Sequence, residues 1–370
     1  MDPGGERRRR GLFDADGDGD LDLWLTNGST LEALRAGKPG AGNTLWLNDG
    51  KIHFTNATET AGIGGSRWGN GVAVGDVDND RDLDVFVAEL GPDCLYLNDG
   101  KGHFREVGAK AGLADPRWSA SATFVDFDRD GRLDLFVANY LQFDLEKPPA
   151  WGGDSTWRGA QVMRGPRGLP RERPALYRNS GIGADGIPNY VDVTQKSGIA
   201  KVPASYALGV AAFDFDRDGD DDLFVANDSE PYFLFENQGD GTFRNVADEL
   251  GCSVDDHGHV GSGMGVAFAD FARTGRFGIV VTNFSGQADN LFANHGAYFP
   301  TSPTSVASAD PRSPSSAGDA NSSTATWTAG PISSLPMDTS TRRPIAPGPT
   351  RPTPKATNTS AGWAVAASPK

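Results

Sequence analysis

The sequence predicts an all-β chain folded as a β-propeller of four-stranded blades. The main observation is an acidic motif that returns five times at steps of 50 to 62 residues, with one step of 88. Strand-rich repeats of this length are typical of propellers and solenoids. The 48 Gly and 24 Pro of the 370 residues favour short strands and turns over long helices. The five copies are "FDADGDGDLDLWLTN" from Phe13, "GDVDNDRDLDVFVAE" from Gly75, "VDFDRDGRLDLFVAN" from Val125, "FDFDRDGDDDLFVAN" from Phe213 and "ADFARTGRFGIVVTN" from Ala269.

Each repeat contains four predicted strands in the same order. An apolar strand such as "GVAVGD" precedes the acidic loop, and a second such as "LDVFVAE" follows it. A third, such as "PYFLFEN", leads through a Gly turn into a fourth, such as "GTFRNVA". Asn-Asp-Gly at 48–50 and 98–100 predicts hairpin turns, because these residues tolerate positive φ. Four short antiparallel strands form one propeller blade. A β-sandwich also has many short strands, but it does not require one loop copied five times.

The acidic loops carry the oxygen ligands of a calcium site. Counted from the first Asp, carboxylates fill positions 1, 3, 5 and 9, Gly at position 6 allows the chain to wrap, and position 7 offers a backbone carbonyl. Position 12 lies in a strand, so the loop is not an EF-hand and position 9 must close the site. The candidate calcium ligands are Asp14, Asp16, Asp18, Asp20 and Asp22; Asp76, Asp78, Asp80, Asp82 and Asp84; Asp126, Asp128, Asp130, Arg132 and Asp134; and Asp214, Asp216, Asp218, Asp220 and Asp222.

The five loops differ in how complete this ligand set is. The first, third and fourth have every expected acid and the Gly. The second has Arg81 at position 6, which disfavours positive φ and adds a positive charge, so we expect a weaker site. The fifth retains only Asp270 of the four acids and is expected to hold no metal. Solvated acidic turns without metal are the alternative interpretation.

Two motifs carry a resemblance to known families. "FDFDRDGDDDLFVAN" with "LFENQGDGTF" resembles the FG-GAP/VCBS repeat, and residues 11 to 299 resemble the cartilage acidic protein (ASPIC/UnbV) family, including "VMRGPRGLP" at Val162 and "GMGVAFADF" at Gly263. The resemblance implies a seven-bladed propeller, incomplete here, that binds calcium at the acids above and is secreted or cell-surface without established catalysis. The family often has Cys near the first of these segments, where Thr156 and Arg164 stand in this chain.

Composition and charge narrow the function classes. A net charge of −15 and a pI near 4.7 argue against a nucleic-acid binder. No apolar run reaches the roughly 18 residues of a membrane span. "ERRRR" is not followed by an apolar segment, so no signal peptide is visible, although a secreted, periplasmic or cell-surface protein is expected.

The two cysteines, Cys94 and Cys252, cannot build a disulfide framework and are expected to be buried small residues.

The step of 88 residues contains an insert at about 143–174. Its segment "LEKPPAWGGDSTWRGAQVMRGPRGLPRERP" holds six basic residues and three acids. Long loops on a rigid scaffold often carry function, and aromatic and Arg side chains are frequent in binding hot spots. Trp151, Trp157 and Arg158 are therefore candidate contacts to an extracellular protein or glycan. A structural lid over one blade is the alternative.

The residues favour a non-enzymatic binding or adhesion scaffold. A polysaccharide lyase on the same propeller would need a base and a charge neutraliser in one cleft, for which Arg158 and Lys147 are the candidates. A lectin-like glycan binder would use Trp151 and Trp157. "DDHGH", with His257 and His259, is a weak transition-metal signal. The sequence has no nucleophile elbow, phosphate loop or HExxH motif.

The chain divides into a partial propeller at 1–299 and a low-complexity tail at 300–370. The tail holds twelve of the 24 Pro, three acids and no repeat, as an ordinary disordered tail would. Read with shifted codon boundaries, however, Ser323 to Ser334 permits D-C-D-L-D-G-R-P-D-L-F, an acidic loop about one repeat after Asp270. We therefore expect the tail to be a frameshift product and the native protein to continue as further blades.

Overall fold

The computed structural model describes residues 10–38, 40–64, 68–147, 156–157, 160–161, 165–284 and 287–300. All of these residues belong to one compact unit of the chain. The predicted tail lies outside the described residues, apart from Pro300. The domain boundary at 299 and the frameshift therefore remain predictions.

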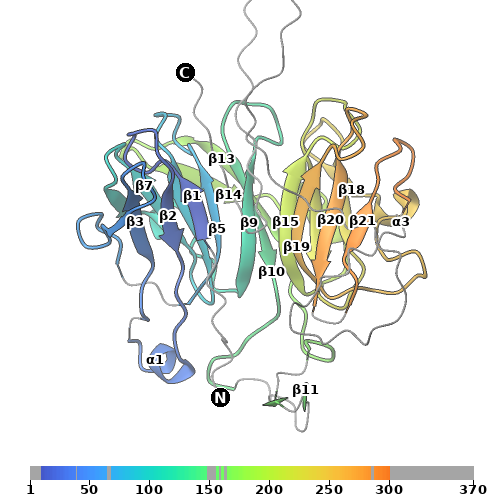
Figure 1. Ribbon diagram of the computed structural model, residues 1–370, viewed down its shortest axis with the longest axis horizontal. Coiled ribbons are helices and arrows are strands. Elements are labelled where there is room, and N and C mark those ends of the chain that lie inside the picture. Colours follow the sequence, from blue (N-terminus) through green and yellow to red (C-terminus); the bar gives the residue numbers. More distant parts are fainter. Residues whose placement is uncertain are drawn as a thin grey trace, which may run out of the picture. The chain divides into compact units, whose positions relative to one another are not determined.

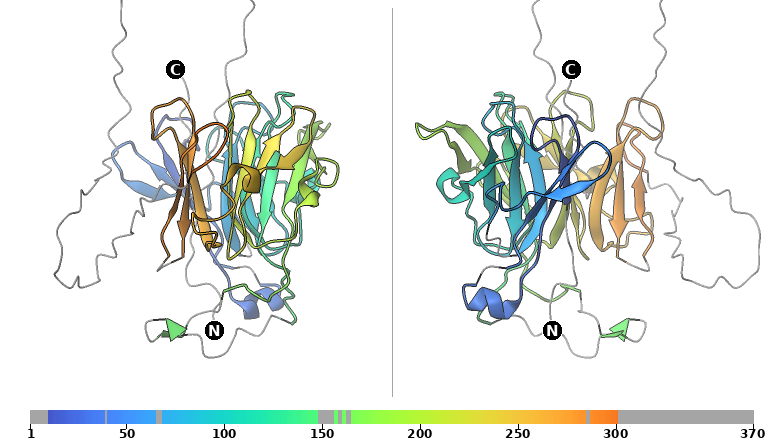
Figure 2. Two further views of the ribbon diagram at one scale, coloured as in Figure 1. Left: turned by 90° about the vertical axis from the view of Figure 1, so that its right-hand side faces the viewer. Right: turned by 60° about the vertical axis from the view of Figure 1, so that its left-hand side comes forward.

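The described residues form five consecutive antiparallel sheets, which are the blades of a β-propeller (Figures 1 and 2). This confirms the predicted fold class and the order of strands within a blade. The first four blades have four strands each and the fifth has three. The blades consist of β1 (Arg10–Phe13), β2 (Asp22–Leu25), β3 (Thr44–Asn48) and β4 (Phe54–Asn56); β5 (Gly69–Gly75), β6 (Asp84–Glu89), β7 (Cys94–Asn98) and β8 (Phe104–Glu106); β9 (Ser119–Val125), β10 (Asp134–Asn139), β13 (Ala175–Ile182) and β14 (Pro188–Asp192); β15 (Ala207–Phe213), β16 (Asp222–Asn227), β17 (Phe233–Asn237) and β18 (Phe243–Asn245); and β19 (Gly263–Ala269), β20 (Gly278–Asn283) and β21 (Asn290–Phe292).

Short elements connect the strands. Helix α1 (Leu31–Arg35) lies between β2 and β3, and α2 (Gly108–Ala111) and α3 (Ala247–Leu250) follow the last strands of the second and fourth blades. A 3-10 turn, η1 (Ile199–Lys201), follows the third blade. The insert carries the two-stranded pair β11 (Thr156–Trp157) and β12 (Ala160–Gln161). Because these pieces are short, almost all of the ordered backbone pairing comes from the blades.

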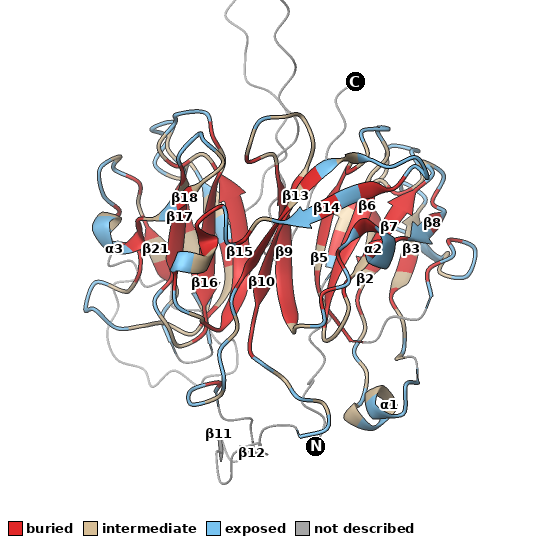
Figure 3. Ribbon diagram, turned by 180° about the vertical axis from the view of Figure 1, so that it is seen from behind, coloured by how far each residue is buried: buried red, intermediate tan, exposed pale blue. Residues whose placement is uncertain are grey.

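The hydrophobic core lies between adjacent blades. Each blade's first strand contacts the first strand of the next, from β1 to β5, β9, β15 and β19 in turn. The strands β6, β10 and β16 are buried along their whole length, as the red ribbons of Figure 3 show. A strand buried on both faces needs a nearly continuous apolar run, which explains why "DVFVAE" and "DLFVAN" do not alternate.

The first and fifth blades are less buried than the three between them. Strand β4 is exposed throughout, and only Gly263 and Val266 of β19 are buried. In the described part of the chain each of these blades has a neighbour on one side only, and Figure 1 shows them, in blue and orange, at opposite ends of the row. Exposed blade faces and edges of this kind favour aggregation.

An asparagine in or just after the third strand fastens neighbouring blades together. In blades two to five its side-chain amide donates to the main-chain carbonyl at position 2 of the preceding blade's acidic loop, at 2.7–2.9 Å. The acidic loops are thus tied to the next blade as well as to their own. The donor and acceptor pairs are Asn98 with Ala15, Asn179 with Val77, Asn237 with Phe127, and Asn294 with Phe215.

Candidate metal centres

The five acidic loops share one wrapped backbone. At position 1, an Asp oxygen accepts the N–H of position 6 at 2.7–3.2 Å in every loop. Position 6 has φ between 78° and 93°, the left-handed region that the sequence predicts for Gly. The second loop adopts this left-handed conformation as well, since Arg81 has φ 84°. Having Arg in place of Gly at position 6 therefore does not unwrap the loop.

Position 4 is also left-handed in all five loops, which was not predicted from the sequence. Its φ values lie between 56° and 77°, although only one of the five residues is Gly. Non-Gly residues seldom adopt such values outside tight turns, so their recurrence at one position marks a required bend. The residues are Gly17, Asn79, Arg129, Arg217 and Arg273.

The wrapped loops bring carboxylates together in the four acidic copies. In each, one oxygen from each of three Asp lies within 4.8 Å of the other two. The fifth loop keeps the backbone, with Asp270 accepting the N–H groups of Thr274 and Gly275, but it lacks the cluster because Ala272, Thr274 and Gly278 replace the other acids. The clusters are Asp14, Asp16 and Asp18; Asp76, Asp78 and Asp84; Asp126, Asp128 and Asp134; and Asp214, Asp216 and Asp218.

Three carboxylate oxygens in these clusters are buried without a hydrogen-bond partner. They are Oδ1 of Asp76, Oδ1 of Asp126 and Oδ1 of Asp128. An unsatisfied buried acceptor costs about 1–3 kcal/mol, and more when it is charged. A bound cation would satisfy such oxygens, so the residues of the second and third loops fit a metal ion.

The position 9 carboxylates link each acidic loop to the third strand of its blade. They are almost completely buried. Their Oδ2 atoms accept the N–H of position 2 at 2.8–3.2 Å, and their Oδ1 atoms accept the N–H of the third-strand Asn at 2.7–2.9 Å. Position 9 therefore has a structural role besides the predicted metal ligation. The residues are Asp22, Asp84, Asp134 and Asp222.

We expect the metal-free protein to lose stability as the pH rises from about 6 to about 8. Burial raises the pKa of Asp84, Asp134 and Asp222 to about 8 and that of Asp22 to about 6, despite the amide hydrogen bonds that lower it. Unfolded Asp titrates near pH 3.9, so over this range the folded state binds more protons than the unfolded state, and its stability falls as they are lost. Melting in a chelator should give the higher midpoint at about pH 6. A higher midpoint at about pH 8 would contradict this assignment.

Carboxylates of the third loop already pair with cationic side chains. This lowers the calcium affinity expected for the loop, which has a complete set of acids. Arg178 of β13 donates through Nε to Asp128 at 2.5 Å and through a terminal nitrogen to Asp130 at 2.9 Å. Arg132 also pairs with Asp130. Two of the loop's carboxylates thus already have a guanidinium partner, and we expect this loop to bind a cation more weakly than the first and fourth.

Position 4 side chains reach the acidic loop of the next blade. The Asn79 side-chain amide donates to the Gly131 carbonyl at 3.2 Å. Arg129 forms an ion pair with the carboxylate of Asp220, whose predicted role is to provide a carbonyl. Neighbouring loops are therefore in direct contact, and a charged side chain of one loop can pair with a charge in the next.

The predicted partner residues lie largely beyond what the structure describes. Trp151 and Arg158 are outside the described residues, and Trp157 is placed only as part of β11. The two ends of the insert are described. Leu141 bridges to Arg171, and Phe143 and Leu169 pack against a cluster that includes Tyr206. The insert therefore leaves the propeller from the end of the blades opposite the acidic loops.

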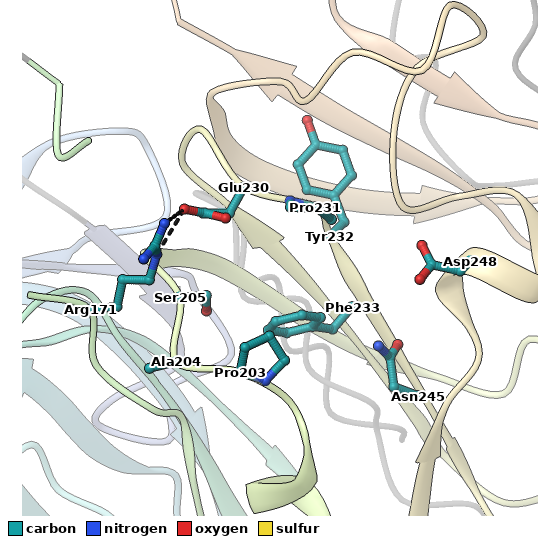
Figure 4. A pocket seen from close by; sticks show the side chains of 10 residues that line it. All are labelled: Arg171, Pro203, Ala204, Ser205, Glu230, Pro231, Tyr232, Phe233, Asn245 and Asp248. Atoms are coloured by element: carbon teal, nitrogen blue, oxygen red, sulfur yellow. Dashed lines mark hydrogen bonds and ion pairs between the residues drawn. The ribbon is translucent and has the colours of Figure 1, made fainter. Parts of the chain in front are cut away.

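A cavity of about 370 Å³ lies at this same end, beside the fourth blade (Figure 4). Arg171 lies on one side of it, where its guanidinium pairs with Glu230 and sits 5.3 Å from the centre of the Tyr206 ring. Tyr232, Phe233 and two prolines supply apolar surface. The lining residues are Arg171, Pro203, Ala204, Ser205, Glu230, Pro231, Tyr232, Phe233, Asn245 and Asp248.

The remaining predictions concern cysteines and membrane spans. Cys252 is buried and Cys94 is half-buried, and both are free thiols. None of the helices in the described part of the chain has the length and apolar character needed to cross a bilayer.

Comparisons with known proteins identify the repeats. The FG-GAP-like repeat model matches residues 14–87, 76–137 and 214–281, together about half of the chain. Cartilage acidic protein 1 of Mus musculus is 41% identical over 102 residues, which are 27% of this chain and 15% of that protein. The Homo sapiens protein is 40% identical over 102 residues, which are 27% of this chain and 14% of its own length. The alignments thus span a small part of these relatives.

A solved structure of an Agrocybe aegerita lectin, which recognises non-reducing terminal N-acetylglucosamine, is also similar. It has 17% identity and a TM-score of 0.42, and the match covers 80% of this chain and 65% of that chain. A similarity of this size says nothing about a shared ligand.

Proposed function

Because the chain belongs to the FG-GAP-like repeat family, we propose that it is a calcium-binding β-propeller that serves as a non-enzymatic binding scaffold outside the cell or at its surface. The observation that carries the proposal is the set of buried, unpartnered oxygens of Asp76, Asp126 and Asp128 at converging carboxylates.

The donor set favours calcium over other cations. Every proposed ligand is a carboxylate or carbonyl oxygen, and Ca²⁺ accepts six to eight of these in flexible geometry, whereas Mg²⁺ retains water. Four Ca²⁺ in the four clusters would change the net charge from −15 to −7. Calcium sites of extracellular modules typically have dissociation constants of about 10⁻⁴–10⁻³ M. The similarity to cartilage acidic protein 1 supports the extracellular assignment.

The binding surface is proposed at the end of the blades opposite the acidic loops. The insert and the cavity beside the fourth blade meet there, and the cavity combines aromatic and polar side chains as protein or glycan ligands require. The described cavity gives little support to a lyase. Its Arg171 is already paired with Glu230 and is not available to neutralise a substrate carboxylate.

Asp218→Ala is expected to remove one calcium site, and Asp270→Ala none. Asp218 belongs to a three-carboxylate cluster, whereas Asp270 has no other acid at the ligand positions of its loop. Calorimetric titration should show one fewer Ca²⁺ bound by the first variant and an unchanged isotherm for the second. Equal losses would mean that the ligands are wrongly assigned.

A further inference from the structure

Three exposed turns in the chain have the same hydrogen-bonded geometry. In each, one Asp oxygen accepts the N–H groups two and four residues later, and a His stands at the fourth. Two residues after the Asp, the first two turns have Lys51 and Lys101, and the third has a second histidine, His257. The turns are Asp49–His53, Asp99–His103 and Asp255–His259.

The third turn holds its two imidazoles side by side. Asp255 Oδ1 accepts the N–H of His257 at 2.9 Å and of His259 at 2.7 Å, and Gly258 takes φ 78° between them. The two rings are nearly parallel, with centroids 5.9 Å apart. Their side chains are 72% and 77% exposed, so solutes can reach them. The turn therefore presents two neighbouring imidazoles on the surface.

Two carboxylates, those of Asp255 and Asp256, lie beside the imidazoles of His257 and His259. One oxygen of Asp255 and one ring nitrogen each of His257 and His259 lie within 4.8 Å of one another. The ligand atoms of a tetrahedral zinc site are roughly 3.3 Å apart when the metal–ligand bonds are about 2 Å, so small rotations of these exposed side chains suffice. His257 Nδ1 lies 2.6 Å from Asp256 Oδ1, the carboxylate contact that commonly orients a metal-ligating imidazole.

We propose that Asp255, His257 and His259 form a second kind of metal site, which binds a divalent late transition ion of the Zn²⁺ or Cu²⁺ class. Imidazole nitrogens favour these ions, whereas the oxygen-only acidic loops favour Ca²⁺. Three protein ligands leave a coordination position open to water or another ligand.

The site is separate from the acidic loops. It lies in the segment between α3 and β19, and this segment follows the end of the fourth blade where the cavity lies. The proposal does not depend on calcium binding, and it can be tested while Ca²⁺ saturates any oxygen sites.

The test is calorimetric titration of the full chain with Zn²⁺ in saturating Ca²⁺. We expect one Zn²⁺ per chain, with affinity reduced roughly tenfold or more by His257→Lys or His259→Ala. His257→Lys is the sharper variant because it recreates the residue of the two related turns. His53→Ala and His103→Ala are the matched controls, since each removes an exposed His that contacts a turn Asp. Both should bind Zn²⁺ like the wild type.

A second readout identifies the ligands directly. The electron paramagnetic resonance spectrum of one equivalent of Cu²⁺ should show coupling to two imidazole nitrogens, and to one in His257→Lys. The proposal is overturned if His257→Lys binds Zn²⁺ as tightly as the wild type, or if excess Ca²⁺ abolishes Zn²⁺ binding.

Discussion

The metal-free protein is expected to melt at a clearly lower temperature than the calcium-saturated protein. Without metal, three carboxylates converge in each of four loops and repel one another. An ion that binds only the folded state stabilises it by about 4 kcal/mol per site at a thousandfold excess over the dissociation constant. Even one such site raises the midpoint by several degrees.

Thermal melts in excess Ca²⁺ and in chelator measure this effect, and Mg²⁺ is the matched control. Mg²⁺ has the same charge but needs a small octahedral site and retains its water, so its stabilisation should be much smaller. Equal midpoints in Ca²⁺ and chelator would show that the loops fold without a cation. Equal effects of both cations would indicate screening of charge and not a specific site.

Asp222→Ala is expected to destabilise the metal-free protein, whereas Asp218→Ala in the same loop is not. Asp222 is buried and accepts the N–H groups of Phe215 and Asn237, so its loss leaves two buried donors unsatisfied. At about 1–3 kcal/mol for each donor, we expect a cost of roughly 2–6 kcal/mol. Asp218 is exposed and accepts one local N–H, so its removal should cost less than about 0.5 kcal/mol.

Urea unfolding of both variants in chelator separates the structural role of position 9 from metal ligation. Both variants should lose calcium stabilisation at this loop, but only Asp222→Ala should have a lower unfolding midpoint without metal. If the two variants lose the same stability in chelator, position 9 does not anchor the third strand.

Much of the fold could be predicted because each blade repeats the same local chemistry. The acidic loop with its left-handed position 6 and the Asn-Asp-Gly turn are visible in the residues alone; Gly50 and Gly100 adopt φ 73° and 71°. Position 4 was not predicted because Arg129 and Arg217 give no sign of a left-handed backbone. The surrounding loop imposes that conformation, and a single residue cannot reveal it.

The site was harder to predict, because its charges come from residues far apart along the chain. Arg178 lies far along the chain from Asp128, with the insert between them. An alignment of third strands could have found it, since Tyr177-Arg178-Asn179 matches "YLN" at 96–98 with Arg in place of Leu97. The pairing of Arg129 with Asp220 has no such signal, because it depends on how two blades pack.

Equilibrium dialysis against Ca²⁺ tests calcium binding by the acidic loops without reference to stability, because it counts bound ions. We predict saturable binding that approaches four Ca²⁺ per chain, weaker at the third loop, where Arg178 pairs with the ligands, than at the first and fourth. Replacing Asp14, Asp76, Asp126 and Asp214 together should abolish it. Absence of saturable binding at millimolar Ca²⁺, or binding unchanged in that variant, would mean that the acidic loops are not calcium sites.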